Sequence, residues 1–229
     1  MPIYQLSDED VRFPDAMDSE QDGLLAIGGD LSPERLISAY ASGVFPWYNR
    51  KPILWWSPDP RTVIIPQDFK PSKSLKRTIK SGKFEVRFDS AFSRVIDTCG
   101  RISRKGESGT WITTDMKMAY KKLFVLGIGH SVETYHNHHL VGGLYGVSIG
   151  RAFFGESMFH TESDASKVAL NSLIQRLSEQ NFLFLDCQMH TEHLESLGAI
   201  DISKSEYLKL LAKAIKFPTL KGNWGNSFT

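Results

Sequence analysis

The sequence predicts an α+β protein with a small N-terminal α/β domain of residues 1–62 and a larger domain of residues 63–229. The first part is turn-rich, aromatic and dense in proline, whereas the later part alternates short apolar strands with segments of helical spacing. The clearest stretch is residues 140–188. Two apolar runs there flank a tight turn at residues 148–150, and a helix and a short buried strand follow, a pattern of mixed strands and helices.

The first domain is expected to contain one helix and one long aromatic loop. Ser32 is a typical N-cap, Pro33 suits the first helical position, and Gly43 ends the helix. Residues 44–61 hold three tryptophans, one tyrosine and four prolines, which argues against a regular helix or a central strand. These aromatics either pack as an ordered loop or line a cleft, and Trp47 is the one expected to face a ligand.

The middle of the chain predicts a succession of short elements. Residues 70–83 carry six basic residues and no acid, with Leu75 and Ile79 four apart, as in a short helix with a basic outer face. Asp89 is expected to cap the helix after it, and Thr113 or Thr114 the next one. The expected strands are residues 61–66, 84–88 and 131–135, the expected helices are 90–100 and 114–126, and residues 136–139 form a turn.

The last third begins with the stretch 140–188. Ser163 or Asp164 is expected to cap a helix whose apolar positions 168, 170, 173, 174 and 177 fall at helical spacing. Residues 182–185 read as a central strand. A short helix after Thr191, a strand over 199–202 and an amphipathic helix from Ser205 complete the chain, and the tail 222–229 is expected to fray.

The charge is distributed unevenly along a chain whose net charge is only +1. Residues 61–130 hold 15 Lys and Arg against 6 Asp and Glu, which indicates either a polyanionic partner or a solvated helix face. The two cysteines form no CxxC pair, the N-terminus lacks an apolar signal core, and no run approaches about 18 apolar residues. We therefore expect a cytoplasmic protein that does not cross a membrane. The His136-x-His138-His139 turn has no partner motif, so no metal site is expected.

The chemistry is expected at the end of the buried strand. Asp186 and Gln188 lie two residues apart, so a regular strand would turn them to one face, with Cys187 opposite as a core residue. Glu156, beside Ser157, is a further polar group among apolar neighbours. The chain has no HExxH, no P-loop and no GxGxxG after a strand. A carboxylate that deprotonates an amine and a carboxamide that stabilises an oxyanion would suit direct acyl transfer to an amine without a cofactor.

Nine blocks of sequence, in order along the chain, resemble bacterial leucyl/phenylalanyl-tRNA–protein transferases. The resemblance implies a larger domain with a GNAT-like (acetyltransferase-like) fold and transfer of Leu or Phe, less well Met, from aminoacyl-tRNA to the N-terminal amine of proteins that start with Arg or Lys. The product would be marked for N-end-rule degradation, and a monomer is expected. The blocks are FPW (45–47), WWSPDPR (55–61), GTWI (109–112), HSVE (130–133), LVGGLYG (140–146), GESMF (155–159), ASK (165–167), DCQ (186–188) and SLGA (196–199).

The resemblance also implies roles for individual residues. Asp186 and Gln188 would carry catalysis, and Glu156, with Ser157 beside it, would contact the substrate. Trp47 and Trp111 would bind the aminoacyl-adenosine. The apolar pocket would consist of Leu144, Leu170, Leu173, Leu177 and Leu185. Relatives can have aromatic residues at positions 173 and 177, which leaves the preference for Leu or Phe open. The tRNA phosphates would meet Lys73, Lys76, Arg77, Lys80, Lys83, Arg104 and Lys105.

Three other functions remain as alternatives at this point. An acyl-CoA-dependent N-acyltransferase of the same fold would need a glycine-rich pyrophosphate loop before a helix, but residues 159–164 contain two acids and no glycine. A non-catalytic tRNA-binding module would leave the placement of Asp186 and Gln188 unexplained. A transferase that builds peptidoglycan bridges from aminoacyl-tRNA would differ in its acceptor.

Overall fold

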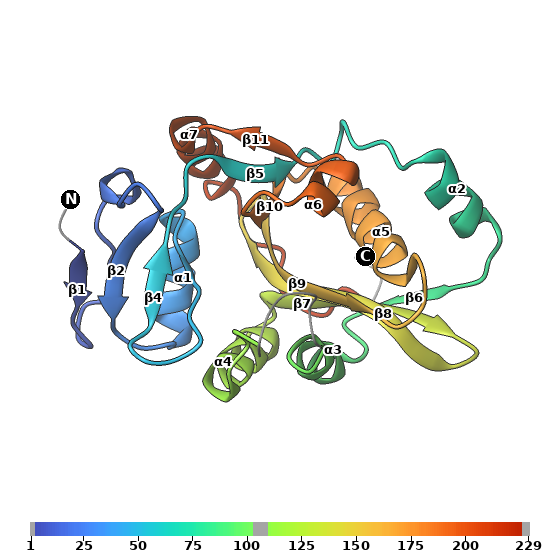
Figure 1. The fold of residues 1–229 in the computed structure, drawn as a ribbon, viewed down its shortest axis with the longest axis horizontal. Coiled ribbons are helices and arrows are strands. Elements are labelled where there is room, and N and C mark those ends of the chain that lie inside the picture. The colour runs from blue at the N-terminus through green and yellow to red at the C-terminus, as the bar shows by residue number, and fades with distance from the viewer. Residues whose placement is uncertain (1–2, 103–109, 226–229) are drawn as a thin grey trace.

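The computed structural model describes residues 3–102 and 110–225, which form two β-sheets with helices on both faces of the larger one (Figure 1). The small sheet contains β1 (Tyr4–Leu6), β2 (Leu24–Gly28), β3 (Phe45–Pro46) and β4 (Leu54–Trp56). The large sheet contains β5 (Arg61–Ile64), β6 (Glu85–Phe88), β7 (Gly129–His136), β8 (His139–Ile149), β9 (Ala152–His160), β10 (Phe184–Gln188) and β11 (Ile200–Ile202). The helices are η1 (Ala16–Asp18), α1 (Pro33–Ala41), α2 (Lys73–Lys80), α3 (Phe92–Cys99), α4 (Thr114–Val125), α5 (Ala165–Glu179), α6 (Glu192–Ser196) and α7 (Lys204–Ala214).

The small sheet has the order β1-β2-β4-β3, and its third strand corrects the sequence analysis. Residues 44–61 were expected to form no central strand, yet β4 lies between β2 and β3. The prolines explain how this is possible. Pro46 lies on the edge strand β3, where a missing N–H is tolerated, and Pro52 and Pro58 lie outside β4.

The large sheet has the order β11-β5-β10-β9-β8-β7-β6. β7, β8 and β9 form an antiparallel meander, whereas β9 and β10 are parallel and connected through α5. In Figure 1, α5 lies on one side of this sheet and α3 and α4 on the other. α5 approaches β8 closely because position 142 is glycine: a Cβ there would lie 2.6 Å from the Ala165 Cβ. The α+β class is confirmed, with α5 held against the strands that border the site.

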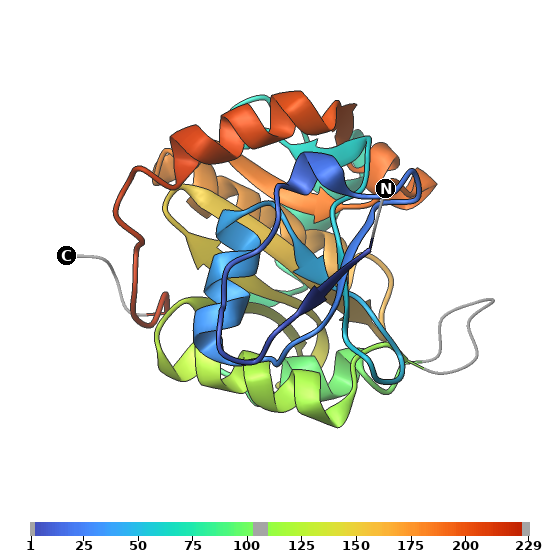
Figure 2. The ribbon, with the colours of Figure 1, turned by 90° about the vertical axis from the view of Figure 1, so that its left-hand side faces the viewer.

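One apolar core connects the two sheets. A single cluster of buried side chains joins Leu25 and Trp55 of the small sheet to Tyr120 of α4 and Phe154 of the large sheet. Figure 2 shows α1 between α4 and α7, so the N-terminal part of the chain packs against elements from much later in the sequence. The division into domains 1–62 and 63–229 therefore stays a prediction.

Most expected elements are present. Apart from the unexpected strands of the small sheet, the main differences concern the ends of elements. The Ser32 cap of α1 and the Thr113 cap of α4 are confirmed. Asp89 does not cap α3, because its carboxylate instead accepts from the backbone N–H groups of Ser131 and Trp224. The expectation of a frayed tail is wrong for residues 222–225, because Trp224 is buried and its ring stacks on His130; residues 226–229 lie outside the described part of the chain.

Candidate active site

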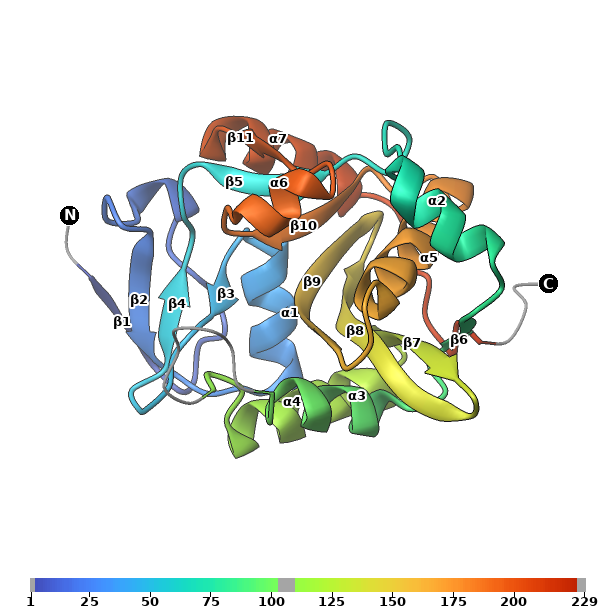
Figure 3. The same cartoon turned by 45° about the vertical axis from the view of Figure 1, so that its right-hand side comes forward.

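A cavity of about 720 Å³ opens where β9 and β10 stop pairing. The parallel pairing covers only residues 152–154 of β9 and 184–186 of β10, after which β9 continues without β10 as its neighbour. Figure 3 shows α5 and α6 on the same side of these strands. Side chains from β8, β9, α5, α6 and the end of β10 line the cavity, together with Phe45, Trp47, Ile102 and Trp111. The site therefore combines residues from both sheets.

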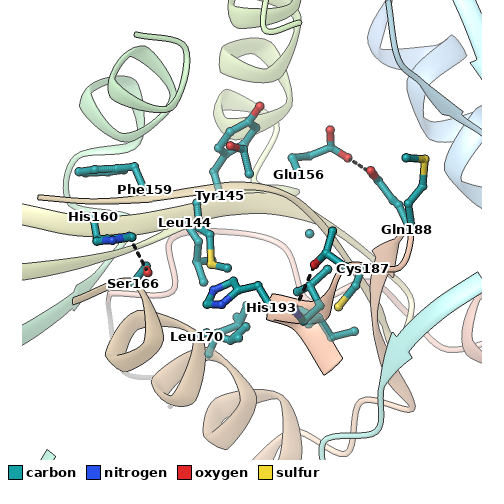
Figure 4. A pocket seen from close by; sticks show the side chains of 18 of the residues that line it. Leu144, Tyr145, Glu156, Phe159, His160, Ser166, Leu170, Cys187, Gln188 and His193 are labelled. Atoms are coloured by element: carbon teal, nitrogen blue, oxygen red, sulfur yellow. Dashed lines mark hydrogen bonds between the residues drawn. The ribbon is translucent and has the colours of Figure 1, made fainter. Parts of the chain in front are cut away.

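One end of the cavity is mainly apolar, although His160, Ser166 and His193 lie near its leucines (Figure 4). Four of the five leucines that were expected to form a pocket line it: Leu144, Leu170, Leu173 and Leu185. Leu177 does not. It is fully buried in the core cluster behind the cavity, one helical turn beyond Leu173. The four leucines that line the cavity can bind a branched aliphatic or an aromatic side chain. The hydrophobic effect would drive this binding, because apolar surface is buried on both sides.

The other end is polar and centres on Glu156. Its Oε1 accepts from the Tyr40 hydroxyl at 2.7 Å and from the Gln188 Nε2 at 2.9 Å, and its Oε2 accepts from the Tyr120 hydroxyl at 2.8 Å. The two hydroxyl oxygens lie 2.5 Å apart. Figure 4 shows the Glu156 and Gln188 side chains pointing toward each other across the end of the sheet. Burial raises the pKa of Glu156 to about 7, although the hydrogen bonds from the two tyrosines lower it.

Asp186 lies behind the cavity and does not line it. Its carboxylate forms a bidentate pair with Arg61, at 2.9 Å to Nε and 2.7 Å to Nη2, and accepts from the Tyr207 hydroxyl at 2.8 Å. It also accepts from the backbone N–H of Gln188 at 2.8 Å. The regular alternation assumed for this strand is interrupted, because the register shifts between Asp186 and Gln188 and Gln188 has a φ of 67°. Asp186 thus holds the backbone turn that presents Gln188.

The two residues beside these acids both line the cavity. Ser157 follows Glu156 on β9, and Cys187 lies between Asp186 and Gln188. Cys187 was expected to be a core residue on the opposite face, and it is in fact half-buried at the cavity wall. Burial raises the pKa of its thiol, so the thiol stays protonated at neutral pH and is a poor nucleophile.

Both tryptophans that were expected to bind the aminoacyl-adenosine lie at the cavity. Trp47 is 38% exposed and meets Trp56 edge to face, with ring centroids 5.7 Å apart. Trp111 is half-buried just before α4. Partly exposed aromatic rings at the entrance of a cavity are suited to stacking on a base.

Four residues that hold the acids in place were not expected from the sequence. Tyr40 and Tyr120 were taken only as helix residues, and Arg61 and Tyr207 as parts of a strand and a helix. Each is fully buried or nearly so, and their partners lie between 21 and 125 residues away in the sequence. Arg61 stands in one of the nine blocks, which was the one available signal.

The expected tRNA-binding residues form a basic surface along α2. The short helix is confirmed, with Leu75 buried and Ile79 partly exposed. Lys73, Lys76, Arg77 and Lys80 are exposed on it. Lys83 pairs with Glu162 at 2.7 Å, so its charge is partly neutralised. Arg104 and Lys105 lie outside the described residues.

The helices that the structure describes include none that is both long enough and apolar enough to span a bilayer. Within residues 3–102 and 110–225, no three His, Cys, Asp or Glu side chains are arranged to hold a metal ion. His136 instead lies 2.9 Å from Glu162 through its Nδ1.

Comparison with known proteins gives a consistent answer. The model of the leucyl/phenylalanyl-tRNA protein transferase family matches residues 63–212, and the model of that family's N-terminal domain matches residues 29–59. The chain belongs to the leucyl/phenylalanyl-tRNA protein transferase family. Relatives with this name include those of Thermodesulfovibrio yellowstonii (53% identical, covering 100% of this chain and 93% of the relative) and Desulfatibacillum aliphaticivorans (50% identical, covering 98% and 96%).

Solved structures with a similar arrangement are more distant. One is L-PGS from Bacillus licheniformis, with a TM-score of 0.44 and 9% identity over 83% of this chain and 72% of that chain. Another is an aminoglycoside acetyltransferase from a soil metagenome, with a TM-score of 0.34 and 11% identity over 65% and 97%. Their TM-scores are too low to support an argument, so the assignment to the leucyl/phenylalanyl-tRNA protein transferase family rests on sequence.

Proposed function

We propose that this protein transfers Leu or Phe, and Met less well, from aminoacyl-tRNA to the N-terminal amine of proteins that start with Arg or Lys. The observation that carries the proposal is a cavity with an apolar end of four leucines and a polar end of Glu156 and Gln188. The family to which the chain belongs supports it. The protein would act as a cytoplasmic monomer and mark its products for N-end-rule degradation.

The apolar end would hold the side chain of the transferred amino acid. Leu144, Leu170, Leu173 and Leu185 present only carbon to it. A pocket of this kind distinguishes side chains by about 1–3 kcal/mol per methylene, so some transfer of Met is expected. The same weak discrimination means that the lining does not fix whether Leu or Phe is the preferred amino acid.

The polar end would hold the ester carbonyl and the incoming amine. An aminoacyl ester is already activated, so its exchange to an amide needs orientation and charge stabilisation more than a nucleophile or a metal. The Nε2 of Gln188 donates to Glu156, which leaves its amide oxygen to accept from the amine. Asp186 would act through Gln188, because it holds the backbone N–H of that residue. An acid at this end favours an acceptor with a basic side chain.

The nucleic acid would be held at two places. Trp47 and Trp111 would stack on the terminal adenosine. The exposed Lys and Arg side chains of α2 would contact phosphates of the tRNA. Lys83, Arg104 and Lys105 are proposed to do the same.

The alternative acyl-CoA transferase is disfavoured by the start of α5. A helix N-terminus binds pyrophosphate through free N–H groups and positive charge. Here Glu162 and Asp164 stand at that end, where Glu162 pairs with Lys83 and Asp164 with Lys167. Both lysines at this end are therefore already paired with carboxylates, and residues 159–164 contain no glycine that would let a pyrophosphate approach the backbone.

The proposal is tested by transfer of radiolabelled Leu from Leu-tRNA to a peptide that starts with Arg. Wild-type protein should label this peptide and leave an Asp-starting peptide unlabelled. Gln188→Ala should slow transfer by about 100-fold, because it removes a polar contact to the reacting groups. Gln5→Ala, at an exposed position on β1, is the matched control and should keep the wild-type rate. Labelling from leucyl-CoA instead of Leu-tRNA would contradict the proposal.

A further inference from the structure

Glu156, Tyr40 and Tyr120 form a closed ring of three hydrogen-bonding groups from three parts of the chain. Tyr40 comes from α1, Tyr120 from α4 and Glu156 from β9. All three pairs are in contact: Tyr40 to Glu156 at 2.7 Å, Tyr120 to Glu156 at 2.8 Å, and the two hydroxyl oxygens at 2.5 Å. Both tyrosines are fully buried, and Glu156 is 8% exposed and lines the cavity.

The number of protons that this ring can hold depends on Glu156. Each phenol has one proton to donate, and a carboxylate has none. When Glu156 is ionised, only the two phenol protons are available for the three contacts. One contact then has no proton between its two oxygen atoms. With Glu156 protonated, the acid donates to Tyr120, Tyr120 donates to Tyr40, and Tyr40 donates back to Glu156. The ring can therefore take up one proton on Glu156 and keep all three contacts.

We infer that the ring of Tyr40, Tyr120 and Glu156 stores the proton that the acceptor amine loses and returns it to the leaving ribose oxygen. This inference rests on the proposed function. The amine nitrogen bonds to the ester carbonyl carbon, and the bond from that carbon to the ribose oxygen breaks. The nitrogen gives up one proton to Glu156, and Glu156 then gives one proton to the ribose oxygen. The enzyme ends the cycle in its starting protonation state.

Asp186 is poorly placed for this step. It does not line the cavity, and its carboxylate is held in a bidentate ion pair by the buried Arg61 guanidinium, which strongly favours its ionised form. Glu156 lines the cavity and is linked to the Gln188 amide. Tyr40 and Tyr120 are positioning residues that act through Glu156.

The groups that face Glu156 explain why it can exchange a proton near neutral pH. Burial raises its pKa to about 7, the phenols and the Gln188 amide lower it, and the Asp186 charge raises it. Arg61 neutralises much of the Asp186 charge. Burial raises the pKa values of Tyr40 and Tyr120 well above the ordinary value, so both remain donors. A group with a pKa close to the working pH can both accept and donate.

The sign of the pH dependence follows from these contacts. Glu156 accepts a proton only as a carboxylate, so transfer should slow as the pH falls through about 7. A hydrogen bond to a charged acceptor is about twice as strong as one between neutral groups, so each phenol stabilises the carboxylate more than the acid. Loss of either hydroxyl should therefore raise the Glu156 pKa and move the fall in rate to higher pH.

The test is the pH dependence of single-turnover Leu transfer to an Arg-starting peptide. Tyr40→Phe and Tyr120→Phe should each move the midpoint on the acidic side upward by about one pH unit. Glu156→Gln should lower the rate by about 10²- to 10⁴-fold. Tyr4→Phe, whose hydroxyl contacts Asp18 in the N-terminal sheet region, is the matched control and should keep the wild-type midpoint.

An infrared titration gives a second measurement that does not need turnover. The protonated carboxyl band of Glu156 should titrate near pH 7 in the wild-type enzyme and be absent in Glu156→Gln. Unmoved midpoints in both phenylalanine variants, full activity of Glu156→Gln, or a wild-type spectrum without this band would overturn the proton store. If the wild-type protein transfers no Leu at all, the proposed function itself has failed, and the two failures are thereby distinguished.

Discussion

In the buried pair of Arg61 and Asp186, each charged side chain is stable in the core only because the other neutralises it. Both side chains are essentially inaccessible, at 1% and 0% exposure, and they are joined by two hydrogen bonds. Removing one partner leaves an unpaired charge in the core, which typically costs about 3–5 kcal/mol, whereas replacing both partners by apolar residues can be nearly neutral. The pair fixes the turn at Gln188 and so connects core packing to the site.

We therefore expect Arg61→Met and Asp186→Leu each to lower the free energy of unfolding by about 3–5 kcal/mol. The double variant Arg61→Met/Asp186→Leu should recover much of this loss, because no buried charge is left unpaired. Urea unfolding followed by circular dichroism measures both. Simple additivity of the two single effects would show that the pair is not coupled.

At the residue scale, the sequence could indicate which side chains carry the chemistry but not how they are held. Glu156 and Gln188 were found because polar residues stood out among apolar neighbours, and both line the cavity. Tyr40 and Tyr120 could not be found in this way, since buried tyrosines in amphipathic helices look like ordinary core residues. Their contact spans 80 residues of sequence.

At the scale of the element, α2 is a short helix whose outer surface is almost entirely basic. Ser72 caps its start, Leu75 holds it to the protein, and the remaining lysines and arginine are exposed. The helix lies beside α5 (Figure 3), whose Leu170 and Leu173 line the cavity. Local patterns predicted this helix well, because its periodicity and its charge both lie within a short stretch of sequence.

Replacing Lys76, Arg77 and Lys80 by glutamine should weaken tRNA binding and flatten its salt dependence. Each phosphate contact contributes roughly 0.7–0.9 to the slope of log Kobs against log salt, so the loss of three contacts should reduce the slope by about 2–3. Filter binding over a salt series measures it. Lys209→Gln/Lys213→Gln, on the exposed face of α7, is the control for loss of bulk charge. An unchanged slope in the α2 variant would place the nucleic acid elsewhere.

Longer patterns at this scale were predicted less well. The proline-rich segment was read as a loop, yet it supplies β3 and the central strand β4, because the prolines fall at an edge and between strands. The start of α5 was expected to be capped by a side chain, but the Asp164 carboxylate instead pairs with Lys167 and Thr78. In both cases a contact made in the folded state overrides the local signal.

At the scale of the whole molecule, the N-terminal part of the chain completes the site. It contributes Tyr40 to the carboxylate and Trp47 to the cavity, while one apolar core joins both sheets. The class, and the order of the elements from β5 onward, could be predicted from the sequence, whereas the strands of the small sheet could not. The meeting of β9, β10, α1 and α4 around Glu156 could not, because it depends on long-range packing.

The central claim is that an apolar cavity selects the amino acid carried by the tRNA. The most direct measurement compares kcat/KM for one tRNA carrying Leu with the same tRNA carrying Ala, with an Arg-starting peptide as acceptor. Leu has three more carbons to bury, each worth about 0.8 kcal/mol, so transfer of Leu should be faster by roughly 50-fold. Equal values for Leu and Ala would contradict the account, because the leucine-lined cavity would then have no part in recognition.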